Sequence, residues 1–161
     1  MSSFCVIGSG ISGATIANLL SKKHTIDLYD KARGLGGRSS FKRLDEKRGF
    51  DHGAQYLSPK SLEFKRFTKK LIKKKILKIW GGKHNFLSDK KKENKKHIKI
   101  IGTKGNSDIS KYLLKDIKCN FNSELKKISF SNKKWNLAFS DGLNKTYENL
   151  ILTCPFPQLK K

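Results

Sequence analysis

The sequence of 161 residues has few cysteines, few prolines and few acidic residues. Its three cysteines, Cys5, Cys119 and Cys154, are far apart and show none of the paired spacings of a zinc site, so we expect no bound metal. An odd number of scattered cysteines is typical of a protein in the reducing cytoplasm. No apolar run approaches the roughly 18 residues that a membrane-spanning helix needs, and the short apolar start lacks the form of a signal peptide.

Acidic residues are too few to balance the basic ones: 36 lysines and arginines face 13 aspartates and glutamates, a net charge of +23. Two interpretations stay open. Either the lysines lie on solvent-exposed faces and reflect a drift in amino-acid composition, or they bind an anionic partner. Aromatic residues are not interleaved with the basic runs as they are on surfaces that stack bases, so nucleic acid is not the expected partner.

What the sequence does contain is a glycine-rich turn, Gly-Ser-Gly-Ile-Ser-Gly at residues 8–13, directly after an apolar run. In this pattern Gly8 permits a tight turn out of a strand. Gly10 lets a pyrophosphate approach the backbone, and Gly13 lets the following helix pack closely on a sheet. The helix N-terminus then offers free N–H groups to phosphates. The alternative interpretation is a glycine-rich turn that binds no ligand.

An acidic residue follows at the spacing that this pattern requires. Asp30 ends a second apolar run, 20 residues after Gly10, where a carboxylate accepts hydrogen bonds from ribose hydroxyls. Ser9 is part of the turn, and the hydroxyl of Ser12 is a further donor. Strand, turn, helix and acid together predict dinucleotide binding.

A second glycine pair, Gly36-Gly37, precedes Arg38 where an ordinary NAD-binding domain would enter its next helix. We expect a loop that runs close along the cofactor. The guanidinium of Arg38 can form two parallel hydrogen bonds with pyrophosphate oxygens. The alternative is a solvated basic turn.

Taken together, residues 8–13, Asp30 and residues 36–38 resemble the FAD-binding signature of the flavin amine oxidase superfamily. A narrower resemblance, to the renalase-type NAD(P)/FAD-dependent oxidoreductases, rests on residues 28–32, 51–56 and 150–157. The resemblance runs from Ser3 to about Leu159. It implies FAD as the cofactor and an oxidoreductase as the activity.

The cofactor-binding residues expected from the turn and from the resemblance together are Gly8, Ser9, Gly10, Ser12, Gly13, Asp30, Gly37, Arg38, Gln55, Tyr56 and Leu125. The resemblance implies that Gln55 and Tyr56 lie near the flavin ring and that backbone groups at Leu125 hold the adenine. A core aromatic is the alternative for Tyr56.

The expected fold is α/β, with a Rossmann-like FAD-binding domain at residues 1–58 and 98–161 and part of a substrate-domain sheet inserted at residues 59–97. Apolar runs predict four parallel strands, at residues 4–7, 25–29, 117–121 and 150–153. Alternation after the third predicts a three-stranded β-meander, at residues 127–131, 134–140 and 144–148. A helix over residues 11–22 is expected to present one stripe, formed by Ile11, Ala14, Thr15, Asn18 and Leu19. Residue 106 or 107 is expected to cap a helix that reaches about residue 115.

The resemblance implies hydride transfer from a dihydronicotinamide nucleotide to FAD and then to O2, with an amine substrate as the superfamily's alternative. No catalytic residue is assigned, because the sequence shows neither a nucleophile with its base nor an evident carboxylate pair. Proteins of this type are expected to be longer, and this chain stops near their middle. Activity is therefore expected to need a partner chain that supplies the missing half. A non-catalytic or decayed FAD- or NAD-binding fragment is the other alternative.

Overall fold

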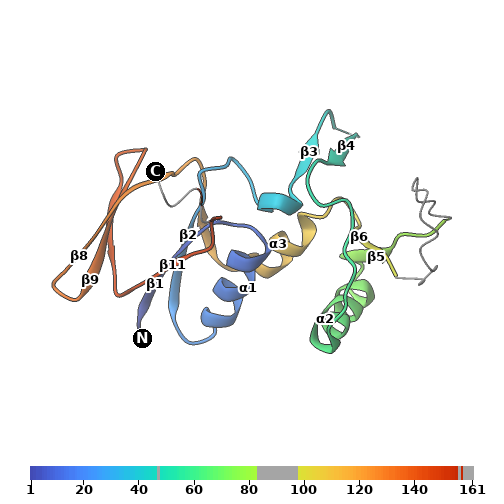
Figure 1. The fold of residues 1–161 in the computed structure, drawn as a ribbon, viewed down its shortest axis with the longest axis horizontal. Coiled ribbons are helices and arrows are strands. Elements are labelled where there is room, and N and C mark those ends of the chain that lie inside the picture. The colour runs from blue at the N-terminus through green and yellow to red at the C-terminus, as the bar shows by residue number, and fades with distance from the viewer. Residues whose placement is uncertain (47, 83–97, 156, 158–161) are drawn as a thin grey trace.

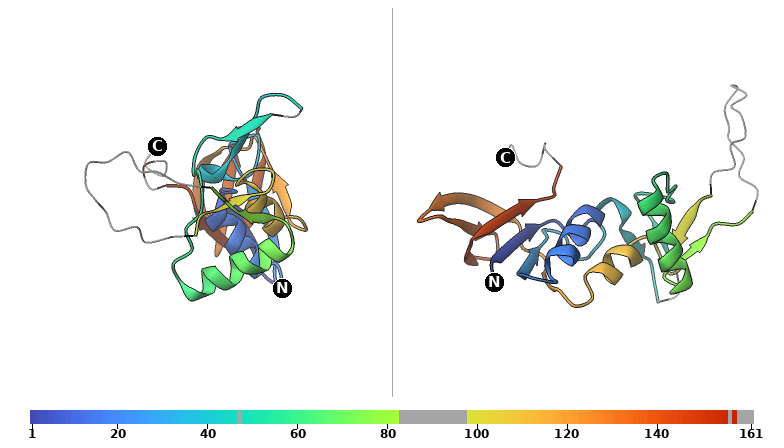
Figure 2. Two further views of the ribbon diagram at one scale, coloured as in Figure 1. Left: turned by 90° about the vertical axis from the view of Figure 1, so that its right-hand side faces the viewer. Right: turned by 90° about the horizontal axis from the view of Figure 1, so that it is seen from below.

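The fold is described by a computed structural model, which covers residues 1–46, 48–82, 98–155 and 157. The described chain is elongated, with three groups of elements side by side (Figures 1 and 2). A small antiparallel sheet forms one end, a parallel sheet with two helices forms the middle, and α2 with a two-stranded sheet forms the other end. Residues 83–97 of the expected insertion lie outside the described residues.

The middle of the molecule is a four-stranded parallel sheet in the order β11-β1-β2-β7. Its strands are β1 (Ser3–Ile7), β2 (Thr25–Tyr29), β7 (Lys118–Asn120) and β11 (Asn149–Leu152). These confirm the four parallel strands expected from the apolar runs. Val6 in the central strand pairs with Leu28 on one side and Ile151 on the other, so apolar side chains form a continuous row across the sheet.

The helix α1 (Ile11–Leu20) connects β1 with β2 and packs through its smallest residues. Gly13, Ala14 and Ala17 are buried, whereas Leu19 is 55% exposed. The expected stripe is therefore wrong at Leu19 and at Thr15, which is exposed and donates its hydroxyl to the carbonyl of Ile11. A helix that follows so short a turn lies close to the sheet, and only small side chains fit between them.

The three-stranded meander covers the other face of the parallel sheet. It consists of β8 (Leu125–Ser131), β9 (Lys134–Phe139) and β10 (Asn144–Tyr147), in the order β10-β9-β8, as expected. Tyr29 of the parallel sheet stacks on Phe139 with ring centroids 4.3 Å apart. The hydroxyl of Tyr147 donates to the carboxylate of Asp27 at 2.8 Å and lies 2.8 Å from the hydroxyl of Tyr29. This buried polar network joins the two sheets.

The far end of the molecule holds the helix α2 (Leu62–Lys73) and the antiparallel strands β5 (Leu77–Ile79) and β6 (Ile100–Gly102). Ser61 caps α2, since its hydroxyl accepts from the N–H of Phe64. Thr68 and Leu71 are the buried residues of this helix. Among the described residues, no helix has the length and apolar character needed to cross a membrane.

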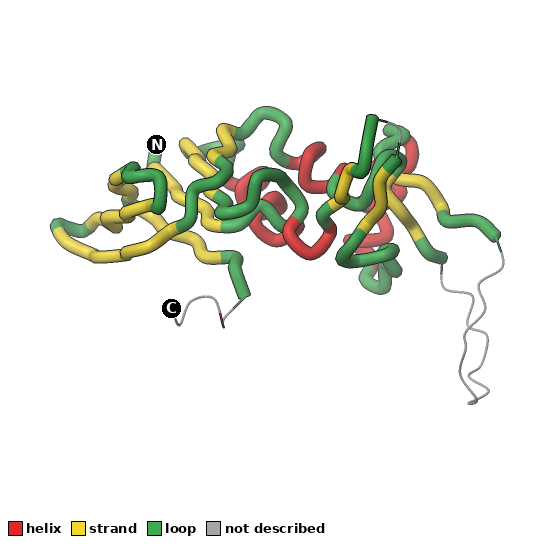
Figure 3. Tube along the Cα trace, turned by 90° about the horizontal axis from the view of Figure 1, so that it is seen from above, coloured by secondary structure: helices red, strands yellow, loops and turns green. Residues whose placement is uncertain are grey.

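Four short elements connect this end with the middle. A hairpin of β3 (Phe41–Arg43) and β4 (Gly49–Asp51) follows the 3-10 turn η1 (Gly37–Ser39), and α3 (Asp108–Leu113) packs beside α1 (Figure 3). The helix α3 is shorter than expected. Ser107 occupies its N-cap position, but its side chain makes no capping hydrogen bond.

We expect Leu71→Ala to lower the free energy of unfolding by about 2–5 kcal/mol, because it leaves a cavity under α2. The side chain of Leu71 is fully buried. Leu62→Ala in the same helix is the control, since Leu62 is 57% exposed and its truncation should cost no more than about 0.5 kcal/mol. Urea unfolding followed by circular dichroism measures both, and equal losses would contradict the packing described.

Candidate functional site

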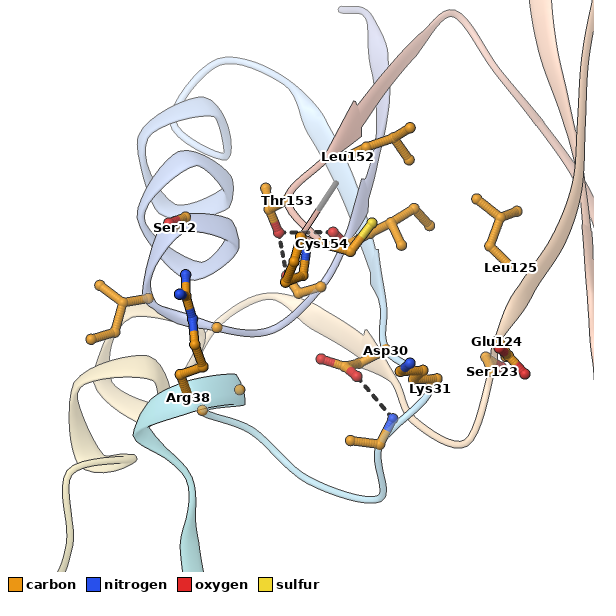
Figure 4. A pocket seen from close by; sticks show the side chains of 18 of the residues that line it. Ser12, Asp30, Lys31, Arg38, Ser123, Glu124, Leu125, Leu152, Thr153 and Cys154 are labelled. Carbon is orange, nitrogen blue, oxygen red and sulfur yellow. Dashed lines mark hydrogen bonds between the residues drawn. The ribbon is translucent and has the colours of Figure 1, made fainter. Parts of the chain in front are cut away.

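A cavity of about 510 Å³ opens at the carboxyl ends of the parallel strands. Figure 4 shows Arg38 and Ser12 at one end of it, Asp30 and Lys31 in the middle, and Glu124 and Leu125 at the other. Ligands of open α/β sheets bind at this edge, because the loops after the strands leave a crevice there.

The turn between β1 and α1 forms one wall of the cavity. Gly8 adopts a φ of +107°, which favours glycine. A Cβ on Gly13 would lie 1.9 Å from the carbonyl oxygen of Gly8, so the helix approaches the strand more closely than any side chain allows. The helix begins after Gly10 with no side-chain cap and no acidic residue in its first turn. Its free N–H groups and the positive end of its dipole therefore face the cavity.

Asp30 lies at the end of β2 and is held by the same turn. One carboxylate oxygen accepts from the N–H of Ser9 at 2.7 Å and from its hydroxyl at 2.5 Å, and the other accepts from the N–H of Ala32 at 2.8 Å. Ser9 is completely buried, so it fixes the orientation of the carboxylate and does not itself line the cavity. A carboxylate offers about four acceptor positions, which leaves room for a hydroxyl of a ligand.

The second glycine pair lies directly against the first turn. Gly10 and Gly36 form a parallel bridge, and the N–H of Gly36 donates to the carbonyl of Ser9 at 3.2 Å. The Arg38 side chain stands beside the first turn of α1 (Figure 4). Within the described part of the chain it forms no ion pair. Helix dipole and guanidinium thus place positive charge at the same end of the cavity.

The opposite end of the cavity is more apolar and is built by two strands. Leu125 and Ile128 of β8 face this end, together with Leu152 at the end of β11. The carboxylate of Glu124 and the ammonium of Lys126 pair at 2.6 Å beside them.

Beyond β11 the backbone turns over the cavity. Thr153 donates its hydroxyl to the carbonyl of Ile7 at 2.8 Å, and Cys154 follows with its thiol on the cavity wall. Thr153 and Cys154 are not among the cofactor-binding residues expected from the sequence. Their position in the sequence could have marked them, since they directly follow a parallel strand. Residues that follow neighbouring parallel strands lie together at one edge of the sheet.

The structure brings together seven of the residues expected at the cofactor: Gly8, Gly10, Ser12, Asp30, Gly37, Arg38 and Leu125. Ser9 and Gly13 are buried directly behind them. Gln55 and Tyr56 do not line the cavity. The ring of Tyr56 instead lies 5.8 Å from that of Trp80 and 4.6 Å from the ammonium of Lys99. Their place beside a flavin stays a prediction.

No group of three histidine, cysteine, aspartate or glutamate side chains in the described ranges is arranged to hold a metal ion. The cavity offers carboxylate acceptors, backbone donors, one arginine and two lysines, Lys31 and Lys126. This donor set suits an anionic organic ligand with hydroxyl groups.

Comparison with known solved structures shows the same fold. A CLA-producing fatty acid isomerase from P. acnes superimposes with a TM-score of 0.70 at 11% identity, over 99% of this chain and 60% of that one. The tetracycline destructase Tet(51) superimposes with a TM-score of 0.59 at 18% identity, over 95% of this chain and 38% of that one.

Comparison by sequence is more specific. Residues 6–71 match the NAD(P)-binding Rossmann-like domain family. Renalase from Mus musculus is 30% identical over 172 aligned residues, which cover 99% of this chain and 48% of renalase. The chain thus spans about half the length of this relative. The chain is similar to renalase and matches an NAD(P)-binding Rossmann-like domain, a combination that indicates FAD binding.

Proposed function

We propose that this chain holds FAD lengthwise in the cavity and forms the cofactor-binding part of a renalase-like oxidoreductase. The observation that carries the proposal is the order of groups along the cavity. Positive charge lies at one end, Asp30 in the middle, and apolar side chains beside the Glu124–Lys126 ion pair at the other end. This order corresponds to a pyrophosphate, a ribose and an adenine in sequence.

The pyrophosphate fits the end formed by the two glycine segments. A Cβ on Gly10 would meet no atom closer than 3.9 Å, so the space above this residue is open to a ligand. The uncapped first turn of α1 supplies backbone donors, and the guanidinium of Arg38 supplies a planar pair of them. No acidic side chain of the described chain competes for Arg38.

The ribose and adenine fit the rest of the cavity. Asp30, oriented by Ser9, accepts hydrogen bonds from ribose hydroxyls. Leu125 and Leu152 present apolar surface to the adenine, and this agrees with the role that the resemblance implies for the backbone at Leu125.

Bound FAD would supply the hydride acceptor, taking a hydride from a dihydronicotinamide-type substrate and passing the electrons to O2 to give hydrogen peroxide. We assign residues 1–58 and 98–161 to a FAD/NAD(P)-binding Rossmann-like domain, and residues 59–97 to an inserted part of a substrate domain. No residue of the cavity is assigned a proton-transfer role. Cytoplasmic location is part of the same proposal.

A second candidate is a FAD-binding subunit that becomes active only with another polypeptide. One observation favours it. Gln55 and Tyr56, the residues expected beside the flavin ring, lie outside the cavity. The cavity of this chain thus accommodates the nucleotide part of FAD, and a second polypeptide would supply the surroundings of the flavin ring. An activity of the amine oxidase type would require the same second polypeptide.

We expect the purified chain to bind FAD saturably, and Arg38→Ala to raise its Kd by roughly 10-fold to 100-fold, because a charge-assisted contact with the pyrophosphate is lost. Arg33→Ala is the matched control. Arg33 lies in the same loop and does not line the cavity, so the Kd should stay within about twofold. Fluorescence titration of FAD measures all three proteins, and an equal Kd for wild type and Arg38→Ala would contradict the site.

We expect bound FAD to protect Cys154 from alkylation, because the thiol lies on the cavity wall. Cys119 is the internal control, since it lies in β7 and does not line the cavity. Cys5 should not react with or without FAD, because it is fully buried and burial raises the pKa of its thiol to about 12. Mass spectrometry after a timed iodoacetamide pulse gives each rate. An unchanged rate at Cys154 under saturating FAD would place the cofactor elsewhere.

A further inference from the structure

Asn106 is a fully buried polar residue outside the glycine segments, located just before α3. Its backbone N–H donates to the carboxylate of Asp51 at 2.8 Å. Its side-chain amide donates to the carbonyl of Ala54 at 2.7 Å and accepts from the N–H of Gly102 at 2.8 Å. One residue therefore ties together the end of β4, the segment that follows it, and the end of β6.

The segment that Asn106 holds lies against the backbone of Arg38. The N–H of Ala54 donates to the carbonyl of Arg38 at 2.7 Å. A Cβ on Gly53 would lie 2.1 Å from the same carbonyl oxygen, so the two backbones are in direct contact. Ala54 also lines the cavity. A chain of two hydrogen bonds thus runs from the Asn106 amide through Ala54 to Arg38.

The other side of the η1 turn is held by the first glycine turn. Gly36 donates its N–H to the carbonyl of Ser9, and the buried hydroxyl of Ser39 donates to the carbonyl of Gly36 at 2.8 Å. The side chain of Arg38 extends from this turn toward α1 (Figure 4). The position of its guanidinium consequently depends on the backbone anchors at both sides.

The amide of Asn106 is suited to this task because it donates and accepts at once. A carboxylate in its place would keep the acceptor for Gly102 and lose the donor to Ala54. An alanine would lose both and leave buried polar groups without partners.

We propose that Asn106 is a positioning residue for cofactor binding. It fixes the 51–54 segment, which holds the Arg38 backbone, so that the guanidinium is presented to the pyrophosphate. This inference rests on the proposed FAD site. It adds to that site a residue from the sequence between β6 and α3, which no glycine motif marks.

A double-mutant cycle separates positioning from plain structural support, because two residues that act through one contact do not contribute additively. Asn106→Ala should raise the Kd for FAD about tenfold in the wild-type background and leave it within about twofold in the Arg38→Ala background. Adenosine, which has no phosphate, should bind to Asn106→Ala within about twofold of wild type, as measured by saturation-transfer NMR.

Equal losses of FAD affinity in both backgrounds, or an equal loss for adenosine, would overturn the positioning role and leave the FAD site intact. Failure of the wild-type chain to bind FAD would overturn the proposed function itself. If Asn106→Ala does not fold, as judged by circular dichroism, the same cycle is run with Asn106→Asp. This variant keeps the shape and the acceptor of the side chain, and the same outcomes decide.

Discussion

The contact between Gly13 and the carbonyl of Gly8 is the constraint from which the site follows. The contact leaves no room for a side chain, so α1 starts immediately beside the end of β1. Because the helix starts there, its free N–H groups open into the crevice above the sheet and not into solvent. The small residues Ala14 and Ala17 continue this close approach along the helix. A larger residue at any of these positions would lift the helix and move its N-terminus away from the cavity.

Charge in the cavity is arranged by backbone contacts more than by pairs of side chains. The Asp30 carboxylate is stabilised by three hydrogen-bond donors, all from residues of the neighbouring turns. Arg38 lacks such partners in the described chain, and the dipole of α1 adds to its field. The cavity therefore holds a stabilised negative group in its middle and an uncompensated positive region at one end. An anionic ligand with hydroxyl groups complements both, because its anionic group faces the positive region and its hydroxyl groups donate to Asp30.

Most of the fold could be predicted from the sequence, because apolar runs and the glycine turn are local signals. Apolar runs predicted the four parallel strands, and alternation broken by turn residues predicted the meander. The buried face of α1 was predicted at Gly13 and Ala14 but not at Ala17, since hydrophobicity favours Leu19 while the close packing on the sheet selects small residues. At the site, Cys154 and Asn106 were missed as cavity and anchoring residues. Their roles arise from contacts between segments that lie far apart in the chain, and no local pattern marks such contacts.

The polar network of Tyr147, Tyr29 and Asp27 has a consequence for the apolar wall of the cavity. That wall is carried by β8, and β8 belongs to the sheet whose last strand is pinned by Tyr147. Swinging the meander outward would break the hydrogen bond between the buried side chains of Tyr29 and Tyr147. The separation of β8 from the parallel sheet, and with it the width of the apolar end of the cavity, is therefore fixed by side-chain contacts between the two sheets that lie outside the cavity itself.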